Sequence, residues 1–202
     1  MDPILYEGTL MKNPLHWLEK KMMYSAAIDS AGVSHSICTQ RKEMSCGIAC
    51  VAMVVHRVRG IRLLESALRS YSQCFYQGPN VKNTGGYDAK KGTEPFNLAI
   101  MLKKMAIPCE YRDSGRALSV LPGASMKKPI IGTVCWDAPP MASGGEANAG
   151  SHFVLIDSCD AASGMAVICD PFNGLVECDV RGGYTTGTGN KGGFTGEWTI
   201  VT

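Results

Sequence analysis

Residues 48–58 constrain the fold more than any other segment, because apolar side chains would occupy most of their circumference in a helix. A helix that is apolar on nearly all sides lies in the middle of a packed domain. Gly60 follows as a natural stop, since glycine readily adopts the left-handed conformation that ends helices. We therefore expect a central, buried helix over residues 46–60.

Cys46 stands at the start of this helix, directly after the polar stretch 40–45. Unpaired backbone N–H groups and about half a positive charge at a helix N-terminus make a thiol there easier to ionise, and the thiolate is the nucleophile. Gly47 lets another group approach the backbone closely. Gln40 can bring a side-chain amide back toward the sulfur as an oxyanion donor. This pattern is half of an acyl-transfer site.

The base for such a site must come from one of four histidines. His16 lies in a polar helix candidate, His35 in a Ser-rich linker and His56 on the central helix itself. His152 differs, because it precedes an apolar run that predicts a strand over residues 151–157. A ring at the mouth of a strand can face a cleft, so His152 is the expected base.

Asp170 is expected to orient His152 across a hairpin. The polar and small residues 160–164 interrupt two apolar runs and predict a turn. A turn centred near Ala161 would place His152 opposite Asp170, and opposed side chains of antiparallel strands lie roughly 4.5–5.5 Å apart at Cβ. A bulge would break this register, and Asp157 would then compete as the orienter.

Helical patterns in the first half of the chain and strand patterns in the second predict an α+β fold with a cleft between the halves. Thr93 is expected to cap the third helix. The glycine-containing loops 77–92, 137–150 and 181–196 are expected to rim the cleft, and candidate wall residues are Tyr87, Trp136 and Tyr184, for which ordinary packing is an equal alternative. The expected helices cover residues 63–71 and 94–105, and the expected strands cover residues 107–112, 129–136, 151–157, 164–170, 175–180 and 197–201.

The chain has 202 residues, 45% of them hydrophobic, and can bury one good core. We expect a catalytic domain over residues 38–202 and an appendage over residues 1–37, with a helix near residues 14–23 and a linker over residues 30–36. The appendage can be a clasp packed on the domain, a propeptide, a delivery signal or an arm. Such an arm would bind a chaperone, immunity or delivery partner.

A net charge of +2 argues against nucleic acid as a partner. No run is long enough to span a membrane, and residues 1–3 lack the basic start of a secretory signal. We therefore expect a protein that is cytoplasmic as synthesised, for which a signal-peptide-independent system is the expected route of any secretion. The nine cysteines show no zinc-site spacing, and Cys50 is expected in the core. We expect neither a metal nor a cofactor.

The joint order of these residues resembles the papain-like cysteine peptidases of the C39 type, the bacteriocin-processing peptidases and their stand-alone C39-like relatives. The resemblance spans about residues 38–180 and implies a papain-like fold, with the nucleophile helix packed on an antiparallel sheet. It also implies hydrolysis of a peptide bond in a protein or peptide substrate. It assigns Cys46 as nucleophile, His152 as base and acid, Asp170 as orienter and Gln40 as oxyanion donor. The motifs are Gln40-x5-Cys46-Gly47, then Gly150-Ser151-His152-Phe153-Val154, then Asp170-Pro171.

Other functions remain open at this point. The same triad can deamidate glutamine or hydrolyse peptidoglycan amides, because the acyl-enzyme is common to these reactions and only the acceptor and the pocket differ. A catalytically silent papain-like domain that only binds a partner is the non-enzymatic alternative. By analogy, a small domain with an N-terminal arm and a Gly-rich tail would suit a secreted bacterial effector or toxin.

Overall fold

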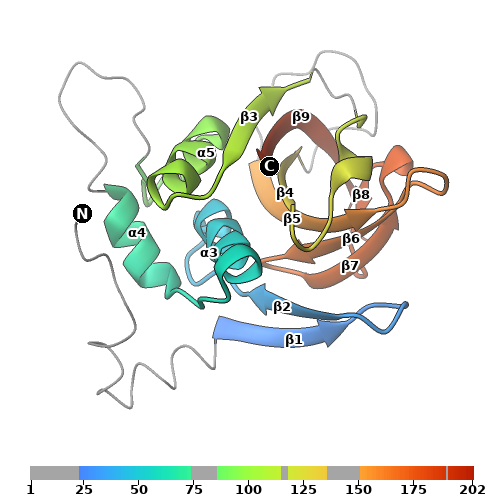
Figure 1. Ribbon diagram of the computed structural model, residues 1–202, viewed down its shortest axis with the longest axis horizontal. Coiled ribbons are helices and arrows are strands. Elements are labelled where there is room, and N and C mark those ends of the chain that lie inside the picture. Colours follow the sequence, from blue (N-terminus) through green and yellow to red (C-terminus); the bar gives the residue numbers. More distant parts are fainter. Residues whose placement is uncertain (1–22, 74–85, 115–117, 136–150, 190) are drawn as a thin grey trace.

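The computed structural model describes residues 23–73, 86–114, 118–135, 151–189 and 191–202. Helices gather on one side of the molecule and the strands of a large sheet on the other, with helix α3 (Cys46–Arg59) in the middle (Figure 1). Ten consecutive residues from Cys46 to Val55 are buried, as the apolar pattern predicts. Gly60 ends α3 in the left-handed conformation with φ 70°, which confirms the expected stop.

Two further helices, α4 (Glu65–Gln73) and α5 (Pro95–Lys104), cover residues expected to be helical. The expected cap of α5 is wrong: Glu94, not Thr93, occupies the N-cap position, and its side chain makes no capping bond. Pro95 is the first helical residue, where its missing N–H costs nothing. The hydroxyl of Thr93 is buried without a hydrogen-bond partner among the described residues.

A seven-stranded sheet with only antiparallel neighbours forms the second half, in the order β3-β9-β4-β5-β6-β7 with β8 beside β9. β9 begins well before the expected strand at residue 197. A Cβ on Gly192 would lie 2.8 Å from the carbonyl oxygen of Cys135 and from Val134, so only glycine allows this close pairing with β4. The strands are β3 (Cys109–Asp113), β4 (Ile130–Cys135), β5 (Ser151–Cys159), β6 (Met165–Asp170), β7 (Gly174–Asp179), β8 (Tyr184–Thr185) and β9 (Lys191–Val201).

A separate hairpin of β1 (Tyr24–Ile28) and β2 (Ser34–Cys38) lies against the α3, β6 and β7 side of the molecule (Figure 1). The expected linker over residues 30–36 is therefore wrong, because its last three residues belong to β2. Asp29 closes the turn by accepting the backbone N–H groups of Ala31 and Val33. The expected helix near residues 14–23 lies almost wholly outside the described residues.

Strand β5 has buried side chains on both faces. Phe153 and Leu155 join the core formed with α3 and α5, whereas Val154 and Ile156 join a second core on the opposite face of the sheet. None of the helices within the described ranges is long and apolar enough to cross a bilayer. His152 is the second residue of β5, directly before Phe153.

Candidate active site

Cys46 is the first residue of α3 and is buried. The side chain of Ser45 at the N-cap makes no capping bond to the first turn and instead contacts the backbone of Lys42. Helix geometry leaves the first backbone N–H groups without intrahelical acceptors. The thiol therefore lies where these N–H groups and the helix dipole favour negative charge.

Gly47 lets the start of α3 pack closely on the start of β5. A Cβ at this position would lie 3.0 Å from the side chains of both Phe153 and Leu98, tighter than most real contacts. Phe153 directly follows His152 in β5. The glycine after the cysteine thus permits the approach that brings the Cys46 thiol to the His152 ring.

His152 joins the two other residues expected in a triad. Its Nε2 lies 2.8 Å from Asp170 Oδ1, and both side chains are buried. The Cys46 side chain is a further hydrogen-bond partner of the ring. Since Nε2 faces the carboxylate, Nδ1 is the nitrogen that can face the thiol. The structure therefore brings Cys46, His152 and Asp170 together.

The electrostatics of the pair favour an ionised carboxylate and a protonated ring. Burial lowers the pKa of His152, but hydrogen bonds to Asp170 and Cys46 outweigh it and raise this pKa to about 9. Burial raises the pKa of Asp170, but its contacts with His152, Asn173 and Tyr184 lower it to about 2. At neutral pH the imidazolium form of His152 can hold a thiolate and later donate its proton.

The expected register of the β5–β6 hairpin is wrong, although the contact it was meant to explain is present. Leu155 pairs with Cys169, and the register shifts by a bulge after Ile156. Continued toward the sheet edge, this pairing places Asp170 beside Val154, so His152 is a diagonal neighbour rather than the opposite residue. Long side chains still meet at diagonal positions. The competing orienter, Asp157, contacts other residues, which are described below.

Asp170 is held by donors that the sequence interpretation missed. Its Oδ1 accepts the backbone N–H groups of Phe172 and Asn173 at 2.6 and 3.0 Å. Its Oδ2 accepts the Asn173 amide at 2.7 Å and the Tyr184 hydroxyl. An Asx turn after Asp170 could have been read from the sequence, since aspartates commonly accept N–H groups two and three residues on. Nothing local indicates Tyr184.

The candidate wall residues have different surroundings. Tyr184 is fully buried and contacts Asp170 rather than lining an open cleft. Tyr87 is also buried, with its ring near Arg69. Trp136 lies outside the described residues, as do residues 137–150 and much of the loop 77–92, which were expected to rim the cleft.

Gln40 is anchored near Asp170, but its amide is engaged elsewhere. Its backbone N–H donates to the carbonyl of Pro171 at 3.0 Å. Its side-chain Nε2 donates to the carbonyls of Lys42 and Glu43 at 3.2 and 3.0 Å. Both amide protons are thus directed at the loop that precedes Cys46. Its Oε1 is buried and has no hydrogen-bond partner among the described residues.

Comparisons with known proteins identify the fold. No protein-family model and no curated protein sequence matches the chain. A structure described as a C39-like peptidase from Bacillus anthracis matches with a TM-score of 0.52 at 14% identity, covering 88% of this chain and 98% of that one. Two further structures match less well.

One is a double-glycine-motif protease from an AMS/PCAT transporter in complex with a leader peptide, with a TM-score of 0.48, 14% identity, and coverage of 88% of this chain and 93% of that one. The other is the peptidase domain of Streptococcus mutans ComA, with a TM-score of 0.43, 11% identity, and coverage of 82% and 98%. The match to the Bacillus anthracis structure confirms the resemblance found in the sequence at the level of the arrangement of helices and antiparallel sheet. The chain has the fold of a C39-like peptidase.

Proposed function

We propose that the protein is a cysteine peptidase with a papain-like arrangement of its site, in which Cys46 is the nucleophile, His152 the general base and acid, and Asp170 the orienter. One observation carries the proposal: the His152 ring bonds to the Asp170 carboxylate and to the Cys46 thiol at once. A nucleophile, a base and a group that orients the base, linked in that order, form the general arrangement for covalent acyl transfer.

The reaction follows from these contacts. The Cys46 thiolate attacks the peptide carbonyl and forms a tetrahedral oxyanion, while His152 holds the proton taken from the thiol. The oxyanion collapses, His152 protonates the departing amine, and a thioester remains on Cys46. Water, deprotonated by His152, then attacks the thioester and regenerates the thiol. Asp170 keeps the ring in the tautomer and orientation that both proton transfers need.

Two donors are assigned to the oxyanion in this proposal. The Cys46 backbone N–H lies in the first turn of α3, where helix geometry provides no acceptor. Gln40 supplies the second donor after its side chain rotates away from the carbonyls of Lys42 and Glu43. Substrate binding would then displace the amide from the loop, so the oxyanion site completes only with substrate present.

The experiment exposes an unfolded protein to the purified chain and searches for new peptide termini by mass spectrometry. New termini support a peptidase. Conversion of glutamine to glutamate without cleavage would indicate a deamidase instead of a peptidase. Released muropeptide ends from peptidoglycan would indicate an amidase. Absence of all three products, with Cys46 no more reactive than other thiols, would favour a binding module.

Cys46→Ala should lower kcat by on the order of 10⁵–10⁶-fold, because no covalent intermediate can then form. The fold should survive, since alanine keeps the helix start and removes one sulfur atom. Circular dichroism and thermal unfolding check the fold, and Cys50→Ala, one helical turn on and fully buried, is the matched control. Full activity in Cys46→Ala would end the proposal.

Several predictions from the sequence extend this proposal. They are the division into residues 1–37 and 38–202, a delivery or immunity partner for the first part, and a role as a secreted effector or toxin. Removal of residues 1–22, followed by the cleavage assay, tests whether this portion of the first part restrains the peptidase.

A further inference from the structure

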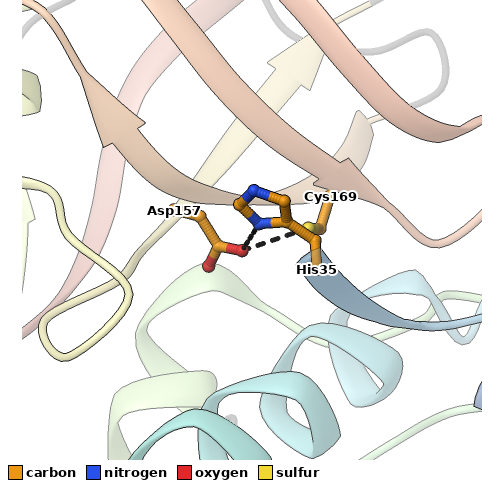
Figure 2. Close-up of side chains that lie close together, drawn as sticks. All are labelled: His35, Asp157 and Cys169. Atoms are coloured by element: carbon orange, nitrogen blue, oxygen red, sulfur yellow. Dashed lines mark hydrogen bonds and ion pairs between the residues drawn. The ribbon is translucent and has the colours of Figure 1, made fainter. Parts of the chain in front are cut away.

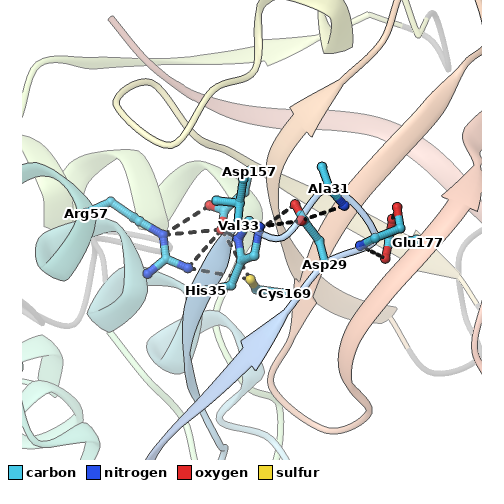
Figure 3. A network of polar contacts seen from close by, with 9 residues as sticks. Asp29, Ala31, Val33, His35, Arg57, Asp157, Cys169 and Glu177 are labelled. Atoms are coloured by element: carbon cyan, nitrogen blue, oxygen red, sulfur yellow. Dashed lines mark hydrogen bonds and ion pairs between the residues drawn. The ribbon is translucent and has the colours of Figure 1, made fainter.

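A second polar cluster shares no residue with the proposed active site and is formed by residues far apart in the sequence (Figure 3). His35 from β2 is buried between two carboxylates, with Nδ1 2.7 Å from Asp157 and Nε2 3.0 Å from Asp29. Arg57 from α3 donates to both oxygens of Asp157 through Nε and Nη2, at 2.8–3.2 Å. We call this the far cluster, and its members are Asp29, His35, Arg57, Asp157 and Cys169.

The far cluster is balanced in charge. Carboxylates only accept hydrogen bonds, so a ring with one at each nitrogen donates from both and is protonated. The hydrogen bond to Asp157 raises the pKa of His35, against burial, which lowers it. Contacts with His35 and Arg57 lower the pKa of Asp157, although burial raises it. Two buried cations thus face two carboxylates.

Three far-cluster side chains have the composition of a metal site, because ligand atoms of His35, Asp157 and Cys169 lie within 4.8 Å of one another (Figure 2). The guanidinium of Arg57, however, lies 2.8 Å from Asp157 and 3.5 Å from the sulfur of Cys169. A cation therefore already stands beside the atoms that a metal would need, and a divalent ion would have to displace it. The contacts fit a structural role.

The far cluster and the proposed catalytic pair lie at opposite ends of the same two elements. Along α3, Cys46 and Arg57 are eleven residues apart, roughly 16 Å at 1.5 Å per residue. Along β5, His152 and Asp157 are five residues apart, about 17 Å at 3.4 Å per residue. α3 packs directly on β5, and the two elements contact at both ends over nearly equal lengths.

Asp170, the third member of the proposed triad, is also linked to the far cluster through its neighbour in β6. Cys169, the residue before Asp170 in β6, has its sulfur 3.2 Å from Asp157. His35 belongs to β2, which ends two residues before Gln40. The backbone N–H of Gln40 donates to the carbonyl of Pro171, the residue after Asp170. All the elements that carry the proposed site therefore meet at one buried carboxylate, Asp157.

We propose that Arg57, Asp157 and His35 are positioning residues, which lock α3 and β2 to β5 at the far end and so hold Cys46 against His152. This role rests on the proposed function. A helix that contacts a strand at one end only can shift or rotate about that contact. Contacts at both ends prevent this movement and fix the distance between Cys46 and His152. Displacement by about 1 Å at a catalytic contact can cost on the order of a hundredfold in rate.

Arg57→Lys tests the proposal, because lysine keeps the charge but cannot hold Asp157 with a planar fork. Arg59→Lys is the matched control. Arg59 lies two residues after Arg57 in α3, and its guanidinium donates to the carbonyls of Ala106 and Met105 rather than to β5. For each protein, the rate of Cys46 alkylation by iodoacetamide is followed from about pH 5 to about pH 10 by peptide mass spectrometry. Thermal unfolding confirms that the variants fold.

In the unsubstituted protein and in Arg59→Lys, Cys46 should be alkylated faster than the other thiols at neutral pH, because His152 lies beside it. In Arg57→Lys, the rate of Cys46 alkylation at neutral pH should fall about tenfold to a hundredfold. kcat for peptide cleavage should fall similarly, with a smaller change in KM. A purely structural role would lower the melting temperature and leave the alkylation rate unchanged.

Two outcomes separate the proposals. A reactive Cys46 with the same alkylation rate in Arg57→Lys and Arg59→Lys would overturn the positioning role alone. An unreactive Cys46 in the unsubstituted protein would overturn the proposed function and the positioning role with it. If Arg57→Lys does not fold, His35→Gln carries the same measurement, because it removes the charge between the carboxylates and leaves α3 intact.

Discussion

The protein contains two clusters built from the same three residue types, at opposite ends of the contact between α3 and β5. One consists of Cys46, His152 and Asp170, and the other contains Cys169, His35 and Asp157 (Figure 2). Each has a histidine bonded to a buried aspartate at 2.7–2.8 Å. Residue types and this one contact therefore do not distinguish the proposed active site from the far cluster.

The thiols distinguish the clusters. Cys169 is fully buried, and burial together with the adjacent Asp157 carboxylate raises the pKa of this thiol. Cys46 instead lies at a helix start and bonds to a protonatable ring. His35 has both nitrogens bonded to carboxylates, whereas His152 bonds one carboxylate and the thiol. A nearby cation helps a thiol to ionise and act as a nucleophile. The sulfur of Cys169, however, lies closer to the Asp157 carboxylate, at 3.2 Å, than to the Arg57 guanidinium, at 3.5 Å.

The largest expected contrast comes from replacing each aspartate by asparagine. Asp170→Asn should lower kcat by on the order of 10²–10⁴-fold with residual activity, because asparagine can hold His152 in the wrong tautomer. Asp157→Asn should lower the free energy of unfolding by about 3–5 kcal/mol, because it unbalances buried charges. It should lower kcat less than Asp170→Asn does, by about tenfold to a hundredfold, through the position of Cys46. Steady-state kinetics and urea unfolding measure both effects. Equal kinetic and stability losses in the two variants would erase the distinction.

The pH dependence should follow the histidines. Activity should decline as the pH rises through about 9, because His152 then loses the proton it gives to the leaving amine. The folded pKa of His152 exceeds its ordinary 6.5, so its stabilising contribution is complete below about 6.5 and is lost as the pH rises through about 9. His35, whose pKa is also raised, acts in the same direction.

Asp170 has the opposite sign. Its folded pKa of about 2 lies below its ordinary 3.8, so its contribution is present above about 3.8 and is lost as the pH falls through about 2. Urea unfolding at a series of pH values measures the stability, and initial cleavage rates measure the activity. Activity that remains unchanged well above pH 9 would contradict the role given to His152.

Tyr184→Phe is expected to have the smallest effect, and it tests how far the support of Asp170 matters. It removes one hydrogen-bond donor to the carboxylate and leaves the other donors in place. The free energy of unfolding should fall by about 1–3 kcal/mol, and kcat should fall only a few-fold. Tyr111→Phe is the control, because this exposed tyrosine bonds to Glu197. Identical results for both would show that Tyr184 supports nothing beyond local packing.

Local patterns predicted much of the fold and the members of the site. The apolar circumference of α3, its glycine stop and the succession of strands β4 to β7 follow from rules about neighbouring residues, and they are present. The β1–β2 hairpin was missed because a Ser-rich stretch has no intrinsic strand preference. His35 is buried there only because its partners Asp29 and Asp157 meet it in the folded chain.

The sequence by itself determined the central helix that begins at a cysteine, the strand with a histidine as its second residue and the aspartate at the end of the next strand. Those features depend on residues within a few positions of one another. Only the tertiary structure decided the bulged register that puts Asp170 diagonal to His152, and the contacts that place Tyr184 on Asp170 and Arg57 on Asp157. These contacts join residues 14 to 100 positions apart, whose meeting depends on how whole elements pack rather than on any local preference.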